Sequence, residues 1–234
     1  ATMNIPSLTN KIAIISLLLL ALGTAGVRFH WFNFQIGLLM FSLAALLGFI
    51  SICASALFTR RTSDPMGRRE LSQAAIIALP AIIFFGLSVF RGAGAPLIHD
   101  ITTDIENPPQ FIAAKQNRLP SDNSLNYHAS NSSLQKQAYP DVQTIPSVLS
   151  IDEAQGKAVT IAKELGWDIN YQERGHIEAS VRSFWFGFTD DIVIRIAQTP
   201  SGSIIDLRSS SRVGKGDLGE NAKRIRQFTE LYLK

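Results

Sequence analysis

The richest polar segment of the sequence spans residues 208–226, where a predicted strand leads into a glycine-containing turn and then a helix. The turn reads Val213-Gly214-Lys215-Gly216. Backbone N–H groups at a turn before a helix can bind an anion, and nearby cations strengthen such a site. The candidate anion-binding residues are Arg208, Arg212, Lys215 and Arg224.

A purely structural turn is the alternative for this segment. Asp217 would then cap the last helix, and its carboxylate would occupy the anion position. Arg208 or Arg212 would pair with the carboxylates at positions 190 and 191. The segment does not match a phosphate-binding P-loop, because Ser209 stands where that motif requires a glycine.

The best metal candidates of the sequence are His99, Asp100 and Asp104, with Glu106 and Asp141 as further contributors. They lie in an irregular segment, and no second histidine has the spacing of a metal ligand. The alternative is that the aspartates organise turns. We therefore expect neither a metal nor a cofactor.

Catalytic patterns are weak. Asp190 and Asp191 are adjacent carboxylates, but neighbouring strand residues point to opposite faces, so both are not expected to meet one substrate. The sequence contains no serine-hydrolase elbow, and its single cysteine, Cys53, lies in an apolar run. No catalytic residue is predicted, and an enzyme using the Asp-rich segment around residue 100 is the weakest alternative.

Three uncharged apolar runs dominate the N-terminal part of the chain. They predict transmembrane helices at about residues 12–28, 33–58 and 71–90, because a span needs roughly 20 apolar residues. None contains an internal Asp, Glu, Lys, Arg or His, which argues against a transporter or pump. Ala44 and Gly48, four residues apart, would allow two helices to approach closely. Pro80 is expected to kink the third span.

The charge distribution predicts the orientation of these spans. Residues 1–91 carry seven basic and two acidic residues, a net +5, whereas residues 92–234 carry 15 basic and 17 acidic residues, a net −2. The loop after the second span is strongly basic, which places it and the N-terminus in the cytoplasm and the C-terminal domain in the periplasm of a bacterial inner membrane. The predicted interface residues are Lys11, Arg28, Trp31, Arg60, Arg61, Arg68 and Arg69. Because the basic excess belongs to the anchor, nucleic acid is not an expected partner.

The exported part divides into an arm at residues 92–148 and a domain at residues 149–234. The arm is rich in Pro, Asn and Ser, and Phe111, Tyr127 and Tyr139 are expected to anchor it by burying their rings. One short helix is expected near residues 129–137. The arm is otherwise predicted to be extended and to wrap the domain.

The domain shows an α-ββββ-α pattern. Ser150 and Glu153 form a capping box at the first helix. Alternating residues predict strands at 167–172, 176–182, 191–198 and 203–210, joined by short turns. Asp217 is expected to cap the last helix, with Leu218 on its apolar face. We therefore predict an α+β domain with an antiparallel meander sheet covered on one face by two helices.

Several strings in this order resemble the domain-of-unknown-function family 1499. The resemblance covers about residues 95–233 and implies a membrane-associated or exported bacterial domain without an established activity, so no catalytic role is carried over. It rests on residues 208–226 and on Pro108-Pro109, Ala138-Tyr139-Pro140-Asp141, Ile98-His99-Asp100-Ile101-Thr102-Thr103-Asp104 and Trp185-Phe186-Gly187-Phe188-Thr189-Asp190-Asp191.

These observations favour a non-catalytic interaction domain displayed by a multi-pass membrane anchor, as an accessory or partner-binding subunit of a membrane complex. Its expected partners are the lipid bilayer and other membrane protein subunits. The alternative is a periplasmic domain that binds an anionic ligand such as a lipid headgroup.

Overall fold

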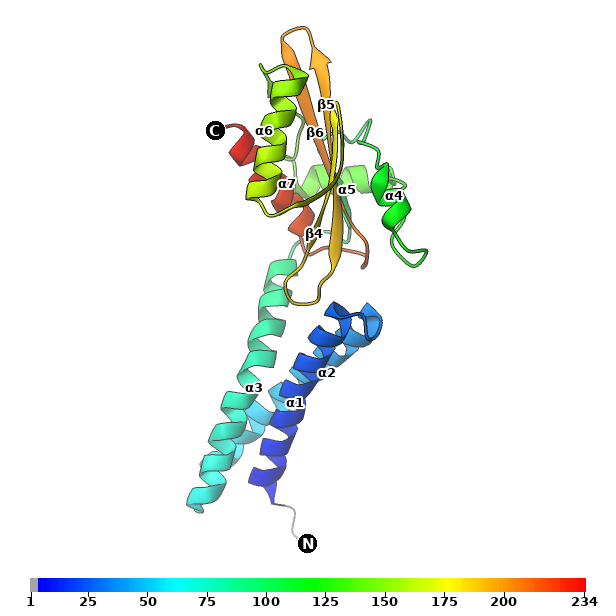
Figure 1. The fold of residues 1–234 in the computed structure, drawn as a ribbon. Coiled ribbons are helices and arrows are strands. Elements are labelled where there is room, and N and C mark those ends of the chain that lie inside the picture. Colours follow the sequence, from blue (N-terminus) through cyan, green and yellow to red (C-terminus); the bar gives the residue numbers. More distant parts are fainter. Residues whose placement is uncertain (1–3) are drawn as a thin grey trace. The chain divides into compact units, whose positions relative to one another are not determined.

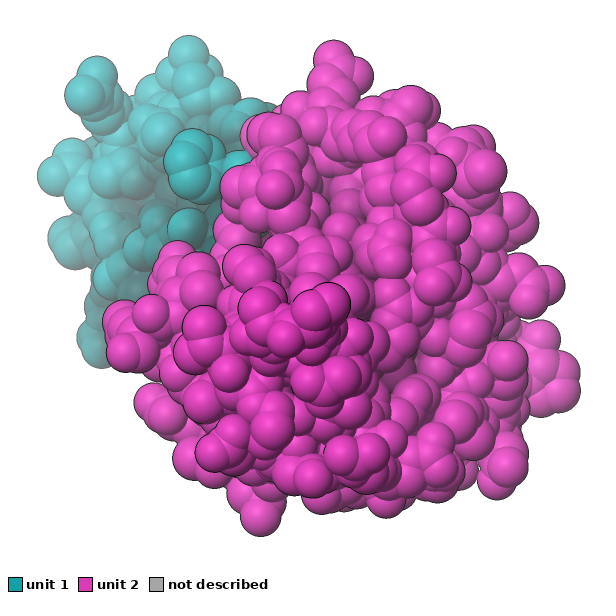
Figure 2. Space-filling view, turned by 90° about the horizontal axis from the view of Figure 1, so that it is seen from above, with its two compact units in different colours: residues 1–91, 184–187 teal, residues 92–183, 188–234 magenta. Residues whose placement is uncertain are grey.

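The computed structural model describes residues 4–234 and divides into two compact units. The first unit contains the chain up to Arg91 together with residues 184–187. The second contains residues 92–183 and 188–234, so the predicted arm and domain belong to one compact unit (Figure 2).

The first unit is built on three long helices, α1 (Ile5–Arg28), α2 (Phe34–Thr59) and α3 (Pro65–Gly92). All three are long and apolar enough to cross a membrane. α1 and α3 begin several residues before the predicted spans because their starts are capped. The Asn4 side chain accepts a hydrogen bond from the Ser7 N–H, and the Asp64 carboxylate accepts from the N–H groups of Met66 and Gly67. Pro80 lies inside α3.

Small residues on α2 bring the three helices together. The Ser16 hydroxyl of α1 donates to the Ala44 carbonyl at 2.7 Å. A Cβ atom on Gly48 would lie 3.1 Å from that hydroxyl oxygen and 3.3 Å from the Ala78 carbonyl of α3. The close approach predicted at Ala44 and Gly48 therefore occurs between helices of this chain, and no larger side chain fits at Gly48 without displacing a neighbour.

The second unit is an α+β domain, as predicted. Its sheet has the strand order β1-β6-β5-β4-β3, with β2 also paired to β6, and every pairing is antiparallel. The predicted four-strand meander is confirmed as β3 to β6, whereas β1 and β2, which the arm contributes, were not predicted. The elements are β1 (Asp100–Thr102), α4 (Ala113–Asn117), α5 (Ser130–Ala138), β2 (Ile145–Ser147), α6 (Ile151–Glu164), β3 (Asp168–Glu173), β4 (His176–Arg182), β5 (Thr189–Thr199), β6 (Gly202–Ser211) and α7 (Glu220–Tyr232).

α6 and α7 cover one face of this sheet (Figure 1). The capping box of Ser150 and Glu153 is present at the start of α6, as predicted. Between the two helices and the sheet lies the main apolar core, which includes Ile177, Ile192, Ile194, Ile205, Leu207, Ala158, Ile161, Ile225 and Phe228. Burial of these apolar side chains stabilises the fold through the hydrophobic effect.

The start of α7 differs from the prediction. The helix begins at Glu220, after Gly219 in the left-handed conformation (φ 83°). Leu218 also has a positive φ and is 51% exposed, so it does not belong to the apolar face of α7. Asp217 nevertheless accepts hydrogen bonds from the N–H groups of Gly219 and Asn221, and in this sense it caps the helix from outside.

The arm is anchored by aromatic rings, as expected. Phe111 and Tyr139 are buried, and the Tyr127 ring lies 5.5 Å from the guanidinium of Arg208. α5 confirms the short helix expected near residues 129–137.

Candidate functional site

The sheet face opposite α6 and α7 is polar, and we call it the charged face. It is formed by the residues of β4, β5 and β6 that alternate with the apolar core positions. Facing residues lie in register: Asp191 opposite Ser210, and Arg195 opposite Asp206. Its members are His176, Glu178, Ser180, Asp191, Val193, Arg195, Asp206, Arg208 and Ser210. α4 and neighbouring arm segments cover this face, so that most of these charges are buried (Figure 1).

Arg208 lies at the centre of the charged face and is fully buried. Its Nε and Nη2 bind the two carboxylate oxygens of Asp100 on β1 at 2.9 and 2.7 Å. Nη1 and Nη2 also donate to the carbonyls of Pro109 and Leu125, respectively, in the arm. The guanidinium also lies 5.1 Å from the Phe111 ring centroid. A bidentate pair, with a partner for each of the three guanidinium nitrogens, compensates for burying the arginine.

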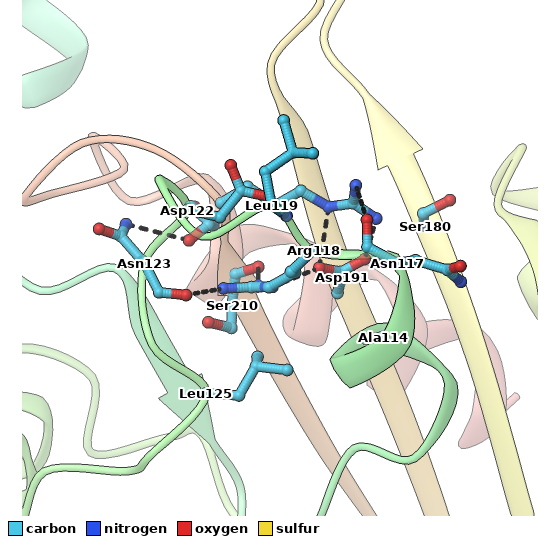
Figure 3. A network of polar contacts seen from close by, with 12 residues as sticks. Ala114, Asn117, Arg118, Leu119, Asp122, Asn123, Leu125, Ser180, Asp191 and Ser210 are labelled. Atoms are coloured by element: carbon cyan, nitrogen blue, oxygen red, sulfur yellow. Dashed lines mark hydrogen bonds and ion pairs between the residues drawn. The ribbon is translucent and has the colours of Figure 1, made fainter.

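Asp191 on β5 is shared by two arginines. Its Oδ2 accepts from Arg118 Nε at 2.7 Å, and its Oδ1 accepts from Arg212 Nη2 at 2.8 Å. The other Arg118 donors bind the carbonyls of Asn123 and Ser210 (Figure 3). Arg118 follows α4 directly, so this network fixes the end of that helix to the sheet.

Arg195 bridges two carboxylates at the opposite end of the charged face from Asp191. Arg195 Nη2 is 2.8 Å from Oδ2 of Asp206 and 2.8 Å from Oδ2 of Asp104. The second oxygen of Asp206 accepts from the hydroxyls of Thr103 and Thr144. Both threonines and Asp104 belong to the arm, so one strand carboxylate and one strand arginine bind three arm side chains.

Glu178 on β4 holds the start of α4. Its carboxylate accepts hydrogen bonds from the backbone N–H groups of Ile112, Ala113 and Ala114, and from His176 Nε2 at 2.9 Å. Burial raises the pKa of Glu178, but the hydrogen bonds from His176 and the three N–H groups outweigh it, and the pKa lies below its usual value. The carboxylate is therefore held ionised, with several donors already bound to it.

A small apolar cluster lies among these ion pairs. Val193, the one apolar member of the charged face, packs against Phe111 and Ala114, with Leu125 beside them. On the charged face, the arm thus combines this apolar cluster with the charged contacts around it.

The predicted anion-binding cations do not meet at one open site. Arg208 binds Asp100, Arg212 binds Asp191, and Arg224 binds Asp190 at 2.8 Å. Lys215 is exposed in the turn. The adjacent carboxylates at 190 and 191 point to opposite faces, as expected, because one binds α7 and the other binds the arm.

The N–H groups at the turn bind a carboxylate of the chain itself. Asp217 accepts from the N–H groups of Gly219 and Asn221. Burial raises the pKa of Asp217 above its usual value, although the two N–H groups act in the opposite direction. This is the arrangement described by the structural-turn alternative.

The predicted metal candidates bind cations or backbone of the chain. Asp100 binds Arg208, and Asp104 binds Arg195. The Asp104 carboxylate also accepts hydrogen bonds from the N–H groups of Glu106 and Asn107, so it organises a turn, as the alternative to metal binding describes. Among residues 4–234, no group of three His, Cys, Asp or Glu side chains has the geometry to hold a metal. His99 is half-buried, and this burial lowers its pKa. Oε1 of Glu106 lies 3.6 Å from Nζ of Lys136, and Asp141 forms an ion pair with Arg226.

Sequence reasoning missed the roles of Glu178, Arg195 and Arg118. The alternation of β4 and β5 placed the first two on the polar face, which is ordinarily a solvent face. One signal was available: Val193 interrupts the polar positions of β5 with an apolar side chain, as expected for a face that is covered. Nothing in the local sequence of Arg118 indicates its partner 73 residues away.

The model of a family described as "Protein of unknown function (DUF1499)" matches residues 100–231, from β1 to α7. No curated protein matches the sequence.

Proposed function

The chain belongs to the DUF1499 family, and from this premise we propose that it is a membrane-anchored accessory subunit whose C-terminal domain binds a partner protein. In this proposal the three long helices span a bacterial inner membrane. The N-terminus lies in the cytoplasm and the domain in the periplasm. The domain itself catalyses no reaction.

The observation that carries this proposal is the internal use of the charged face. Asp191, Asp206 and Glu178 each accept hydrogen bonds from two or more donors of the chain, and all three guanidinium nitrogens of Arg208 donate to groups of the chain. A catalytic acid, base or nucleophile must be able to reach a substrate. These residues instead hold the arm in place, which is the role of a structural framework.

The cavities and surface of the domain also favour a macromolecular partner. A pocket beside α5, lined by residues such as Thr103, Gln135 and Tyr139, has a volume of about 190 Å³. Small-molecule sites usually have roughly 300–1,000 Å³. Leu97 packs against Gly216, two positions before Leu218, and both leucines are largely exposed. Large exposed apolar side chains on adjoining segments of the chain are the candidate contact surface for this partner.

Purification of the full-length chain in mild detergent tests the proposal. We expect a stoichiometric partner protein, and we expect its loss when Leu97 and Leu218 are both changed to Asp. Leu119→Asp, at an exposed arm position, is the matched control and should leave the partner bound. A monomer under several gentle conditions contradicts the proposal. Recovery of an anionic compound that charge reversal at Arg212 and Arg224 removes would favour the anionic-ligand alternative instead.

The orientation is tested separately with alkaline-phosphatase fusions, which are active only after export. A fusion after Lys234 should be active, whereas a fusion in the basic loop at Thr62 should be inactive. The reverse pattern contradicts the proposed topology.

A further inference from the structure

A groove of about 680 Å³ lies along the helices of the first unit. It is formed by the second half of α1 and by α3 from Ile76 to Arg91. Its wall is mostly apolar and includes Leu17, Leu20, Ile76, Leu79, Ile83 and Leu87. The volume falls in the range of roughly 300–1,000 Å³ that accommodates a small molecule.

The polar atoms of the groove gather toward the C-terminal ends of the two helices. The hydroxyl of Thr24 donates within α1, to the carbonyls of Leu20 and Ala21, and that of Ser88 donates to the Phe84 carbonyl in α3. Both hydroxyls are therefore bound by their own helices. Arg91, in the last turn of α3, supplies the positive charge of the groove.

Trp185, which belongs to the same unit, also lines the groove. Tryptophan and arginine side chains are typical of the level of lipid headgroups, where an apolar body meets a polar boundary. The groove thus has a long aliphatic part and one cationic, aromatic end.

We propose that this groove binds an anionic phospholipid, with an acyl chain along α1 and α3 and the phosphate at Arg91. The inference rests on the proposed insertion of the three helices into a membrane. An aliphatic groove in a bilayer is filled by an equally apolar group, and lipid acyl chains surround it. The guanidinium selects the headgroup, because charge-assisted hydrogen bonds from arginine to phosphate are strong and directional.

The charge of Arg91 tests the headgroup contact. The full-length chain is purified in mild detergent, stripped of lipid, and titrated with phosphatidylglycerol or phosphatidylcholine while native mass spectrometry counts bound lipid. We expect one phosphatidylglycerol per chain, bound in preference to phosphatidylcholine. Arg91→Gln should weaken phosphatidylglycerol binding by about tenfold, the loss expected for one hydrogen bond to a charged group. Arg69→Gln, near the opposite end of α3, is the matched control and should leave binding unchanged.

Filling the groove tests the acyl-chain contact. Ala21 lines the groove, so Ala21→Phe should abolish binding of both lipids, whereas Leu22→Phe, at an exposed position one residue further on, should not. Equal binding of the two lipids by the unmodified chain, or unchanged binding in both Arg91→Gln and Ala21→Phe, overturns the inference. So does a copurifying protein that Ala21→Phe displaces, because a partner helix would then occupy the groove.

The failure of this inference is distinguishable from that of the proposed topology. If the fusion after Lys234 is exported and no lipid is retained, only the lipid site is wrong. If the chain is recovered from the soluble fraction of cells, both proposals fail.

Discussion

The two faces of one sheet in this domain are buried by different physical means. On one face, isoleucine and leucine side chains of β4, β5 and β6 pack beneath α6 and α7. On the other face, the intervening residues form ion pairs and hydrogen bonds with the arm. The energy of apolar contacts depends little on the orientation of the groups, whereas a bidentate arginine–carboxylate pair requires one geometry and so fixes the position of its partner. The charged face therefore determines where an otherwise irregular arm must lie.

The largest effect in this comparison is expected for Arg208→Ala. It leaves the buried carboxylate of Asp100 without its partner, which costs about 3–5 kcal/mol in the free energy of unfolding. Urea unfolding of the full-length chain in detergent measures this loss, and hydrogen exchange should show loss of protection first in β1 and the arm.

A double variant provides the control for this prediction. Arg208→Met combined with Asp100→Leu removes both charges, and apolar replacement of a whole buried pair is often neutral. It should recover most of the lost stability. A single variant as stable as the original chain would contradict the role assigned to the charged face.

Ile192→Ala tests the opposite face with a somewhat smaller effect. Ile192 is fully buried beneath the helices, and its truncation should lower the free energy of unfolding by about 3 kcal/mol. Limited proteolysis should cut the arm no earlier than the rest of the domain, because the arm contacts are intact. Early cleavage within residues 104–127 would show that the two faces are not separable.

Glu178→Gln should have the smallest effect and a defined pH dependence. Because hydrogen bonds hold the pKa of Glu178 below its usual value, its ionised form stabilises the fold above the ordinary glutamate pKa of about 4.5, and this stabilisation is lost as the pH falls below that value. The stability difference between the original chain and Glu178→Gln should therefore shrink on acidification below about pH 4.5.

The measurement for Glu178→Gln is the unfolding midpoint of both chains at neutral pH and at successively lower pH. Arg174→Ala is the surface control, since its pair with Asp152 is largely exposed, and it should leave the midpoint unchanged at neutral pH. A difference that grows in acid would mean that Glu178 is not held ionised.

Much of the domain was predictable from local pattern. The alternation in β4, β5 and β6 and the capping box at Ser150 specify elements through residues close together in the sequence. β1 could not be predicted in this way, because its three residues gain their strand partners from β6 more than 100 residues later. The left-handed conformation of Gly219 likewise depends on the surrounding loop. It makes α7 begin at Glu220, so that Leu218 lies outside the helix.

The candidate site was harder to predict than the fold. The sequence marks Asp100, Asp104 and Arg208 as candidates for binding a metal or an anion, but their partners are set by tertiary structure. The same residue types that suggest a metal or an anion site serve here as each other's counter-ions. Only the pairing distances distinguish these cases.

The pairing of the arm with β6 has a consequence for association between chains. The meander alone would end in a ten-residue strand with an open edge. β1 and β2 instead pair with Ser203 to Ser210 from its outer side, and the Thr103 N–H binds the Leu207 carbonyl between them. An open strand edge is a template for aggregation, so the arm protects the domain by completing its own sheet. The strands now at the two edges of the sheet are poor templates: β1 and β2 have three residues each, and β3 has six with a bulge between Ile169 and Tyr171.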